Sequence, residues 1–334
     1  MPTEVLRVDP EAPAADAVAR AAAVLRAGGL VAFPTETVYG LGASALDGAA
    51  VTRLFAAKGR PSNNPLIVHV ADGADAVRVA ASWPTAAARL AERFWPGPLT
   101  LVLPRRPEVP DVVTAGGPTV AVRVPSHPVA QALIRAAGVP VAAPSANRSG
   151  YISPTRAEHV LRGLDGRIEI VLDAGPVPGG IESTVLDLTG DLPRLLRPGL
   201  VSPAEIEAVV GPIVRPQAKP EPSEGPLPSP GLLSRHYAPQ APLELADDDG
   251  RARVEELRDA GRQVGWLTFG APEVAGVTVV AMPRDAAGYA AQLYAALHAL
   301  DGAGVDRIIV AWPPESEEWL AVRDRLRRAA TPAT

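Results

Sequence analysis

The sequence of 334 residues contains no cysteine, and only 4% of its residues are aromatic. The chain therefore forms no disulfide, offers no thiolate to zinc and has no thiol nucleophile. No uninterrupted apolar run approaches the ~20 residues that a membrane-spanning helix needs. Acidic Glu4, Asp9 and Glu11 precede the first apolar stretch, which is unlike a signal peptide. We expect a cytoplasmic protein with no membrane contact.

Lysine is also scarce, because only two of the 32 basic residues are lysines. Lys219 lies in a proline-rich stretch, whereas Lys58 opens the segment Lys58-Gly59-Arg60-Pro61. A lysine is a compact charge on a flexible stem and an arginine is a planar fork, and phosphate sites often use both. Chance in an arginine-biased sequence is an equally open interpretation from composition alone.

The overall balance of charge argues against a dedicated nucleic-acid binder. The formal net charge is −5, with 47% hydrophobic and 21% charged residues, as in ordinary globular proteins. A protein that grips a nucleic-acid backbone is usually basic overall or in one domain. We therefore expect no strong direct binding to nucleic acid. The five histidines show no H-E-x-x-H or similar metal spacing.

A proline-rich segment predicts the division into domains, since seven prolines fall between Pro212 and Pro230. Such a segment is extended and builds neither a helix nor a central strand. We predict a first domain over 1–211, a linker over 212–240 and a second domain over 241–334.

Short apolar runs alternate with helical patterns before this linker, which predicts an α/β domain with a twisted, mixed sheet. The predicted strands are 30–33, 66–70, 99–103, 120–124, 139–143, 168–172 and 184–188, and the predicted helices are 16–27, 49–57, 85–94, 129–137 and 155–164. After the linker, strands are predicted at 264–269, 277–282 and 307–312, and helices at 249–260, 285–299 and 317–329. This second pattern indicates a small Rossmann-like α/β domain without a G-x-G-x-x-G fingerprint.

Polar clusters follow several predicted strands, where sites on α/β sheets usually form. They span 34–42, 58–66, 144–153 and 175–184, the last followed by Arg197-Pro198-Gly199. Each also has a purely structural interpretation: a capped turn, cations at the end of a helix, or a serine-rich loop with a cap at Ser153. His69, in an apolar strand, is more often a satisfied core group than a ligand.

Arg123 lies in the middle of a valine-rich strand, and a buried arginine needs an anion because an unpaired buried charge is costly. Together, the clusters supply dispersed cations and many hydroxyls, without clustered carboxylates or a Ser-His-Asp arrangement. Such a set suits an anionic nucleotide, with catalysis by positioning and charge neutralisation. No Walker A motif is present, which argues against a P-loop NTPase.

Six motifs in a fixed order resemble the YrdC-like family: PTETVYGLG (34–42), KGRPSNNPLIVHV (58–70), TVAVRVPSHP (119–128), PSANRSG (144–150), IESTVLD (181–187) and LRPG (196–199). SPGLLSRHYAP (229–239) resembles the hallmark of its two-domain members, the L-threonylcarbamoyladenylate synthases with a C-terminal extension. Those members often have Met-Lys-Tyr where this chain has Leu232-Leu233-Ser234, so a contact made by that lysine would be missing here.

The resemblance implies a YrdC-like first domain and a nucleotidyltransferase reaction. L-threonine, bicarbonate and ATP, with Mg²⁺ on the phosphates, would give threonylcarbamoyl-AMP and pyrophosphate. A separate tRNA threonylcarbamoyltransferase complex would then transfer the group to the adenosine beside the anticodon of certain tRNAs.

The resemblance also implies roles for particular residues. Lys58 and Arg60 would be the catalytic cations. The ATP site would consist of Lys58, Arg60, Asn64, Thr119, Ser145, Asn147, Ser153 and Arg197, with His236 and Tyr237 folding over it as a lid. The threonine site would consist of Thr37, His69, Arg123, Ala143 and Ser183, with Arg123 binding the carboxylate bidentately.

Two other functions compete with this interpretation. A non-catalytic RNA-binding module is one, although the acidic net charge weighs against it. A carbamoyl-adenylating enzyme of hydrogenase maturation is the other, but those proteins carry cysteine-rich zinc modules. The sequence leaves open the oligomeric state, the Mg²⁺ ligands and any general base. Glu36 and Glu182 are the carboxylates nearest to the predicted site, with solvated surface roles equally open for both.

Overall fold

The computed structural model describes residues 2–215, 227, 229 and 236–330. Its internal contacts divide the chain into two compact units, each described by itself below. Unit 1 comprises 1–149, 154–178 and 182–232, and unit 2 comprises 150–153, 179–181 and 233–334. The predicted linker over 212–240 stays a prediction, since most of it, with Lys219 and Leu232-Leu233-Ser234, lies outside the described residues.

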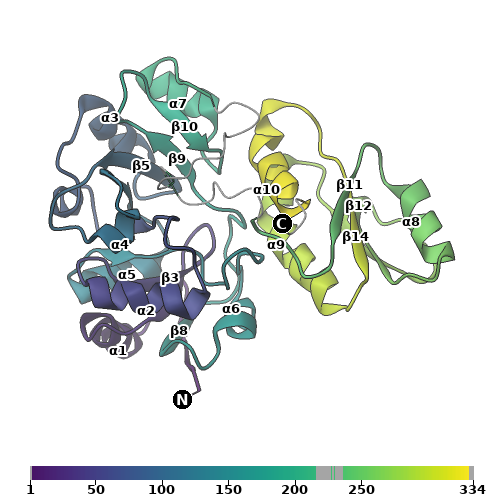
Figure 1. Cartoon of the computed structure of the whole chain (residues 1–334), viewed down its shortest axis with the longest axis horizontal. Helices are drawn as coiled ribbons and strands as arrows, with labels where there is room; N and C mark the ends of the chain where they lie inside the picture. Colours follow the sequence, from purple (N-terminus) through teal and green to yellow (C-terminus); the bar gives the residue numbers. More distant parts are fainter. Residues whose placement is uncertain (1, 216–226, 228, 230–235, 331–334) are drawn as a thin grey trace. The chain divides into compact units, whose positions relative to one another are not determined.

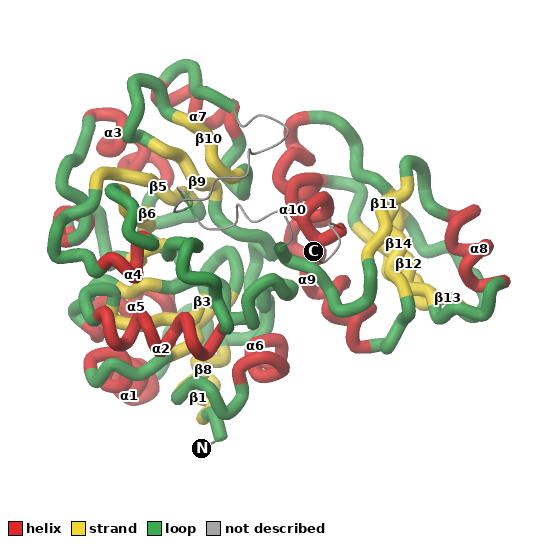
Figure 2. Tube along the Cα trace, in the orientation of Figure 1, coloured by secondary structure: helices red, strands yellow, loops and turns green. Residues whose placement is uncertain are grey.

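Unit 1 is built on a mixed sheet, as the sequence predicted. Its described strands run in the order β1-β8-β2-β3-β7-β4-β6-β5-β9-β10. Figure 2 shows β1 and β8 near one end of this sheet and β9 and β10 near the other. Their bounds are β1 Glu4–Arg7, β2 Val31–Pro34, β3 Tyr39–Ser44, β4 Ile67–His69, β5 Leu99–Pro104, β6 Thr119–Arg123, β7 Val141–Ala142, β8 Ile170–Asp173, β9 Thr184–Asp187 and β10 Arg194–Arg197. Parallel pairs such as β4–β6 and β5–β9 alternate with antiparallel pairs such as β5–β6 and β4–β7.

Helices pack against this sheet (Figure 1). They are α1 Ala15–Arg26, α2 Gly48–Lys58, η1 Asp75–Arg78, α3 Thr85–Phe94, α4 Asp111–Thr114, α5 Pro128–Ala137, α6 Ala157–Leu164 and α7 Pro203–Val210. α6 begins at Ala157, so the cap expected at Ser153 is wrong: the residue before the helix is Arg156.

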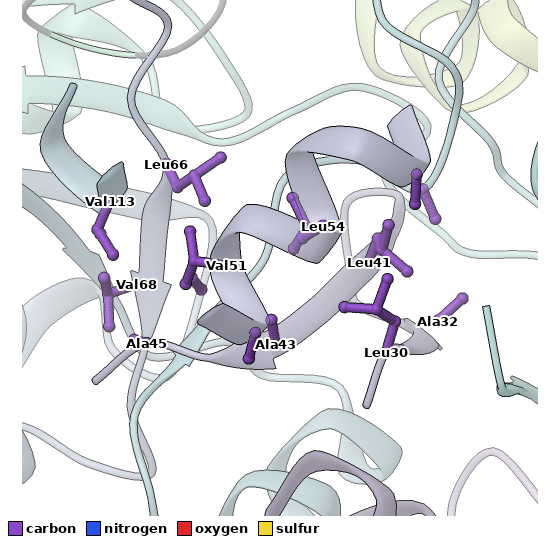
Figure 3. Packing of buried hydrophobic residues seen from close by; sticks show 14 of the residues in the cluster. Leu30, Ala32, Leu41, Ala43, Ala45, Val51, Leu54, Leu66, Val68 and Val113 are labelled. Carbon is purple, nitrogen blue, oxygen red and sulfur yellow. The ribbon is translucent and has the colours of Figure 1, made fainter. Parts of the chain in front are cut away.

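The core of unit 1 has two sides, because β2 is buried on both faces. On one side, Ala32 packs with Leu41 and Ala43 of β3 and with Val51 and Leu54 of α2, as Figure 3 shows. On the other side, Val31 and Phe33 pack with α1 and α5. A strand buried on both faces becomes a continuous apolar run, which is why this one was predictable from the sequence.

Unit 2 is a small Rossmann-like domain, as predicted. Its described strands form a parallel sheet in the order β11-β14-β12-β13. The elements are β11 Leu243–Ala246, α8 Arg251–Asp259, β12 Val264–Phe269, β13 Val277–Met282, α9 Ala286–Gly302, β14 Arg307–Ala311, η2 Glu317–Trp319 and α10 Leu320–Ala330. Trp266 of β12 is buried with Val254 of α8 and Ile309 of β14.

Candidate functional site

Lys58 is the last residue of α2, and both ends of this helix are fixed by the local sequence. Asp47 accepts hydrogen bonds from the first turn, and Gly59 ends the helix in a left-handed conformation, with φ of 61°. The Lys58 side chain is buried and donates from Nζ to the carbonyl oxygens of Ser145, at 2.6 Å, and Asn147. The lysine therefore joins the end of α2 to the PSANRSG loop.

This ammonium group is held by neutral oxygens. Burial, followed by the charge of Arg60, lowers the pKa of Lys58 well below its ordinary value. An anion beside Lys58 would oppose both effects, because an opposite charge favours the charged form. The position therefore suits a ligand that brings negative charge.

Arg60 folds back onto the segment that leads into β4. Its Nε donates to the Asn64 carbonyl oxygen at 3.0 Å, and its NH2 donates to Asn64 Oδ1 and Pro65 O, both at 2.7 Å. Asn64 is fully buried, yet its Nδ2 has no hydrogen-bond partner among the described residues. A buried donor without an acceptor costs about 1–3 kcal/mol, so Asn64 Nδ2 is an unsatisfied donor at this end of β4.

The register of β4 and β6 separates the predicted residues into two groups. Ile67 pairs with Ala121, and His69 pairs with Arg123, so Thr119 lies opposite Pro65. Four residues of strand span about 13 Å. Thr119 is therefore near Asn64 at one end of this strand pair, and His69 and Arg123 lie together at the other end. The distance between the two ends suits an extended ligand.

Neighbouring strands bring further polar residues to the Arg123 end. Ile67, Val102, Ala121 and Val185 form a buried cluster across β4, β5, β6 and β9. Because side chains alternate along a strand, residues two positions away point to this same face. They are His69, Thr100, Thr119, Arg123 and Ser183.

Arg123 is buried, and each of its three nitrogens lies close to an oxygen. Its Nε donates to Gly97 O at 3.2 Å, its NH1 donates to Thr37 Oγ1 at 3.1 Å, and its NH2 lies 2.6 Å from Glu36 Oε1. Thr37 in turn shares a 2.7 Å hydrogen bond with Thr35. The loop between β2 and β3 thus reaches the end of β6.

Glu36 is the residue whose position the sequence did not predict. A solvated surface role is wrong for Glu182, which is buried, and for Glu36, whose side chain is 12% exposed. Besides Arg123, the Glu36 carboxylate accepts the backbone N–H of Ser126 through Oε2 at 3.0 Å. The anion that a buried Arg123 requires is therefore partly supplied by the chain itself.

His69 is a neutral imidazole in this site. Burial, together with the charge of Arg123, lowers the pKa of His69 to about 3. Its Nδ1 has no hydrogen-bond partner among the described residues, so it is not the satisfied core histidine that the sequence made the commoner expectation. His69 Nδ1 is therefore a buried, unsatisfied atom in the residue that pairs with Arg123 across β4 and β6.

Arg197, the last residue of β10, is held by Ser183. Its Nε and NH2 donate to Ser183 O at 3.1 and 3.0 Å, and NH2 also lies 3.1 Å from Ser183 Oγ. Ser183 Oγ is 2.8 Å from Thr100 Oγ1. This places Arg197, predicted for ATP, beside Ser183, predicted for threonine. At Gly199, any Cβ would meet Thr184 N at 2.3 Å, which explains the glycine of the LRPG motif.

Two other predicted residues lie in or near β7. Ala143 donates its backbone N–H to Ile67 O at 2.9 Å, which puts it beside β4. Asn147 donates from Nδ2 to Arg148 O at 2.8 Å, which shapes the loop that Lys58 contacts.

Ser153, His236 and Tyr237 belong to unit 2 and are held by its helices. The Tyr237 ring packs on Tyr294, with 5.7 Å between centroids, and the Arg325 guanidinium lies 5.2 Å from its centre. His236 N donates to Arg328 O at 3.2 Å, and Ser153 O lies 3.2 Å from His298 Nε2. His236 and Tyr237 are therefore anchored within unit 2, and their role as a lid stays a prediction.

The cavity that lies outside these groups does not coincide with the predicted site. A cavity of about 260 Å³ lies between the segment after β4 and the end of α5, and none of the predicted site residues lines it. No group of three or more His, Asp or Glu side chains within 2–215 and 236–330 could hold a metal ion. No helix in the same part of the chain has the length and apolarity to cross a membrane.

Fold and polar residues together define the class: an α/β domain with cations and hydroxyls at its strand ends, followed by a Rossmann-like domain. Residues 23–199 match the family described as telomere recombination, Sua5/YciO/YrdC, and residues 201–331 match the C-terminal domain of threonylcarbamoyl-AMP synthase. The chain belongs to this two-domain family.

Individual relatives agree over nearly the whole length. The chain is 47% identical to the threonylcarbamoyl-AMP synthase of Bacillus subtilis (strain 168), covering 94% of this chain and 92% of the relative. Pyrococcus abyssi Sua5 complexed with L-threonine has a TM-score of 0.92 at 43% identity, over 98% of each chain. A P. abyssi Sua5 variant with a consecutive histidine and tyrosine changed to alanine has a TM-score of 0.91 at 42% identity, over 98% of this chain and 96% of that one.

Proposed function

We propose that this protein is an L-threonylcarbamoyladenylate synthase whose unit 1 binds ATP and L-threonine along one face of its sheet. It is an enzyme of the nucleotidyltransferase type, and its product serves tRNA modification. The proposal rests on four buried residues: Lys58, Asn64, His69 and Arg123. Among the described residues, Lys58 donates to neutral oxygens, and the other three each have a nitrogen without a hydrogen-bond partner. The relatives are named as enzymes, which disfavours a non-catalytic RNA-binding module.

The chemistry needs positioning and charge neutralisation. The amine of threonine attacks the carbon of bicarbonate, and one C–O bond of bicarbonate breaks as water leaves, which gives a carbamate. A carbamate oxygen then attacks the α-phosphorus of ATP, and the bond to the bridging oxygen breaks, so that pyrophosphate leaves. No covalent enzyme intermediate is required, and fixed cations stabilise the negative charge that develops on the phosphates.

We assign the ATP phosphates to Lys58, Arg60 and Arg197, with Asn64, Thr119, Ser145, Asn147 and Ser153 completing the nucleotide site. We assign L-threonine to Thr37, His69, Arg123, Ala143 and Ser183. Because Arg123 Nε already donates to Gly97 O, the substrate carboxylate would bind the NH1–NH2 edge of that guanidinium.

We further propose that His236 and Tyr237 act in the nucleotide site. They form the one His-Tyr dipeptide of the sequence, and a consecutive histidine and tyrosine were replaced in the P. abyssi variant. Tyr237 has φ of 61°, a conformation that costs a non-glycine residue of the order of 1–3 kcal/mol and recurs at functional sites. Replacement of either side chain by alanine should impair pyrophosphate release.

Mg²⁺ and a downstream partner complete the proposal. The described residues offer no cluster that fits a protein-held metal, so we expect Mg²⁺ to arrive on the phosphates of ATP and derive no step through it. A tRNA threonylcarbamoyltransferase complex would consume the product in the cytoplasm, by transient contact.

The test is pyrophosphate release from ATP and bicarbonate with each amino acid in turn. Threonine should give the fastest release, and threonylcarbamoyl-AMP should be found by mass spectrometry. Release without any amino acid, or equal release with alanine and threonine, would contradict the proposal. Omission of bicarbonate is the control.

A further inference from the structure

Glu36 has an unused acceptor atom beside Arg123. Its Oε1 lies 2.6 Å from Arg123 NH2, but neither atom has an aligned hydrogen-bond partner among the described residues. Oε2, in contrast, is fixed by the N–H of Ser126. The pair thus has the distance of an ion pair while both facing atoms keep hydrogen-bonding capacity.

Within the part of the chain that the structure describes, Arg123 is the one cation that forms an ion pair with Glu36. His69 is neutral, since its pKa is lowered to about 3 by burial and Arg123. The pKa of His127 is also lowered, mainly by burial, so at neutral pH it carries little positive charge. Arg123 and Glu36 therefore form a neutral, buried plus–minus pair.

An α-amino acid fits such a pair as a zwitterion. Its N–Cα and Cα–C bonds, of about 1.5 Å each, put the nitrogen about 2.5 Å from the carboxyl carbon. A carboxylate on Arg123 thus holds the amino group within reach of a carboxylate that contacts the same guanidinium. A ligand with only a carboxylate would add an uncompensated buried negative charge, which is costly.

We propose that Glu36 binds the α-ammonium group of the amino acid whose carboxylate Arg123 binds, and so selects for zwitterions. The proposal rests on the assignment of Arg123 to the threonine carboxylate made above. Glu36 is then a substrate-binding residue, in addition to any effect on the position of Arg123.

The test compares two ligands by calorimetry on the full chain. L-Threonine carries carboxylate, hydroxyl and amine, whereas 3-hydroxybutanoate lacks only the amine. Glu36→Gln should weaken the binding of L-threonine about tenfold or more, which is the effect of a lost hydrogen bond to a charged group. The affinity for 3-hydroxybutanoate should change less than about twofold. Where the analogue binds too weakly for calorimetry, its inhibition of threonine-dependent pyrophosphate release gives the same comparison.

Matched variants separate the outcomes. Glu4→Gln removes a carboxylate from the exposed pair with Arg20 and should leave both affinities unchanged. Glu36→Asp keeps the charge and should lose less affinity for threonine than Glu36→Gln; a loss as large as that of Glu36→Gln would contradict the proposal. If Glu36→Gln weakens the binding of both ligands equally, Glu36 only orients Arg123. If Glu36→Gln binds threonine more tightly, Glu36 competes with the substrate for Arg123. Either result overturns the proposal. Unchanged threonine affinity in Arg123→Ala would instead overturn the assignment of Arg123.

Discussion

The two units hold their buried cations in different ways. In unit 2, Arg325 NH1 lies 2.7 Å from Asp324, and Arg323 Nε lies 3.6 Å from Glu315. In unit 1, Lys58 donates to two backbone carbonyls, and the described hydrogen bonds of Arg197 go to the oxygens of Ser183.

Under the proposed function, this difference separates a cation that stabilises the fold from one that binds a ligand. A carboxylate cancels the charge of its partner, whereas a carbonyl or hydroxyl fixes the geometry and leaves the positive charge in place. Among the described contacts, Lys58 of unit 1 meets neutral oxygens only, whereas Arg323 and Arg325 of unit 2 each lie near a carboxylate. Arg123 is intermediate, because Glu36 cancels its charge but keeps hydrogen-bonding capacity.

The largest effect is expected at Lys58. Lys58→Ala removes a fixed cation from the phosphates and should slow pyrophosphate release by about 100-fold or more, as the loss of one electrostatic contact to a transition state does. Lys58→Arg should not restore wild-type activity, since a fork and a point charge fill space differently. Steady-state kinetics would measure both.

Arg323→Met is the matched control from unit 2. It should lower the unfolding temperature and leave the KM for ATP unchanged, because its charge is compensated within unit 2. Wild-type rates in Lys58→Ala, or a selective rise in KM for ATP in Arg323→Met, would remove the distinction between the units.

Arg123→Ala should weaken the binding of L-threonine by about 1.5–3 kcal/mol, the range for hydrogen bonds to charged groups. Calorimetry of the folded variant, with ATP binding as the control, would measure this effect. ATP affinity should change much less, because Arg123 lies at the opposite end of β6 from Thr119.

His69 predicts a dependence of stability on pH. Below its unfolded pKa of about 6.5, the unfolded chain takes up a proton that the folded chain, with a pKa of about 3, does not bind. The contribution of His69 to the free energy of unfolding is therefore fully present above pH 6.5 and is lost as the pH falls towards 3. Between pH 6.5 and 5 the loss from this group is about 2 kcal/mol.

Chemical denaturation at several pH values would test this. His69→Gln should lose about 2 kcal/mol less free energy of unfolding than the wild type between pH 6.5 and 5. Because His127 remains in both proteins, the comparison isolates His69. If the free energy of unfolding depends on pH with the same slope in both proteins, the result would contradict a buried, neutral His69.

The smallest effect is expected in unit 2, at Glu244, which pairs with Arg253 at 2.8 Å and Arg307 at 3.2 Å on a partly exposed surface. Glu244→Gln should move the unfolding temperature by no more than about 4 °C. Pyrophosphate release should stay at the wild-type rate. A large fall in activity would place unit 2's charge pairs in the catalytic machinery.

The sequence predicted those elements whose local pattern is strong. β5, β6, β12 and the helices α3 and α5 are apolar runs or amphipathic stretches with turn residues at their ends. β1, β3, β10 and β11 were not predicted. β1 is short and mostly exposed, and its partner β8 is more than 160 residues away, so no local pattern marks it. β3 runs through the glycine-containing PTETVYGLG motif, where a turn was the simpler interpretation.

The site was predictable as a set of residue types but not as a set of contacts. Hydroxyls, cations and an arginine in an apolar strand are visible in the sequence. The pairing of Arg123 with Glu36 joins residues 87 positions apart and depends on where the loop after β2 lies beside β6. One signal was available: a buried arginine must meet an anion, and Glu36 is a carboxylate in the neighbouring motif.

A crystal structure of the full chain with ATP and L-threonine bound is the most direct test of this account. We expect the triphosphate to bind Lys58 and Arg60. We expect the amino acid to bind between Arg123 and Glu36, at the other end of β4 and β6. Ligands bound away from this sheet face, or cations left in contact with carbonyl oxygens alone, would contradict it.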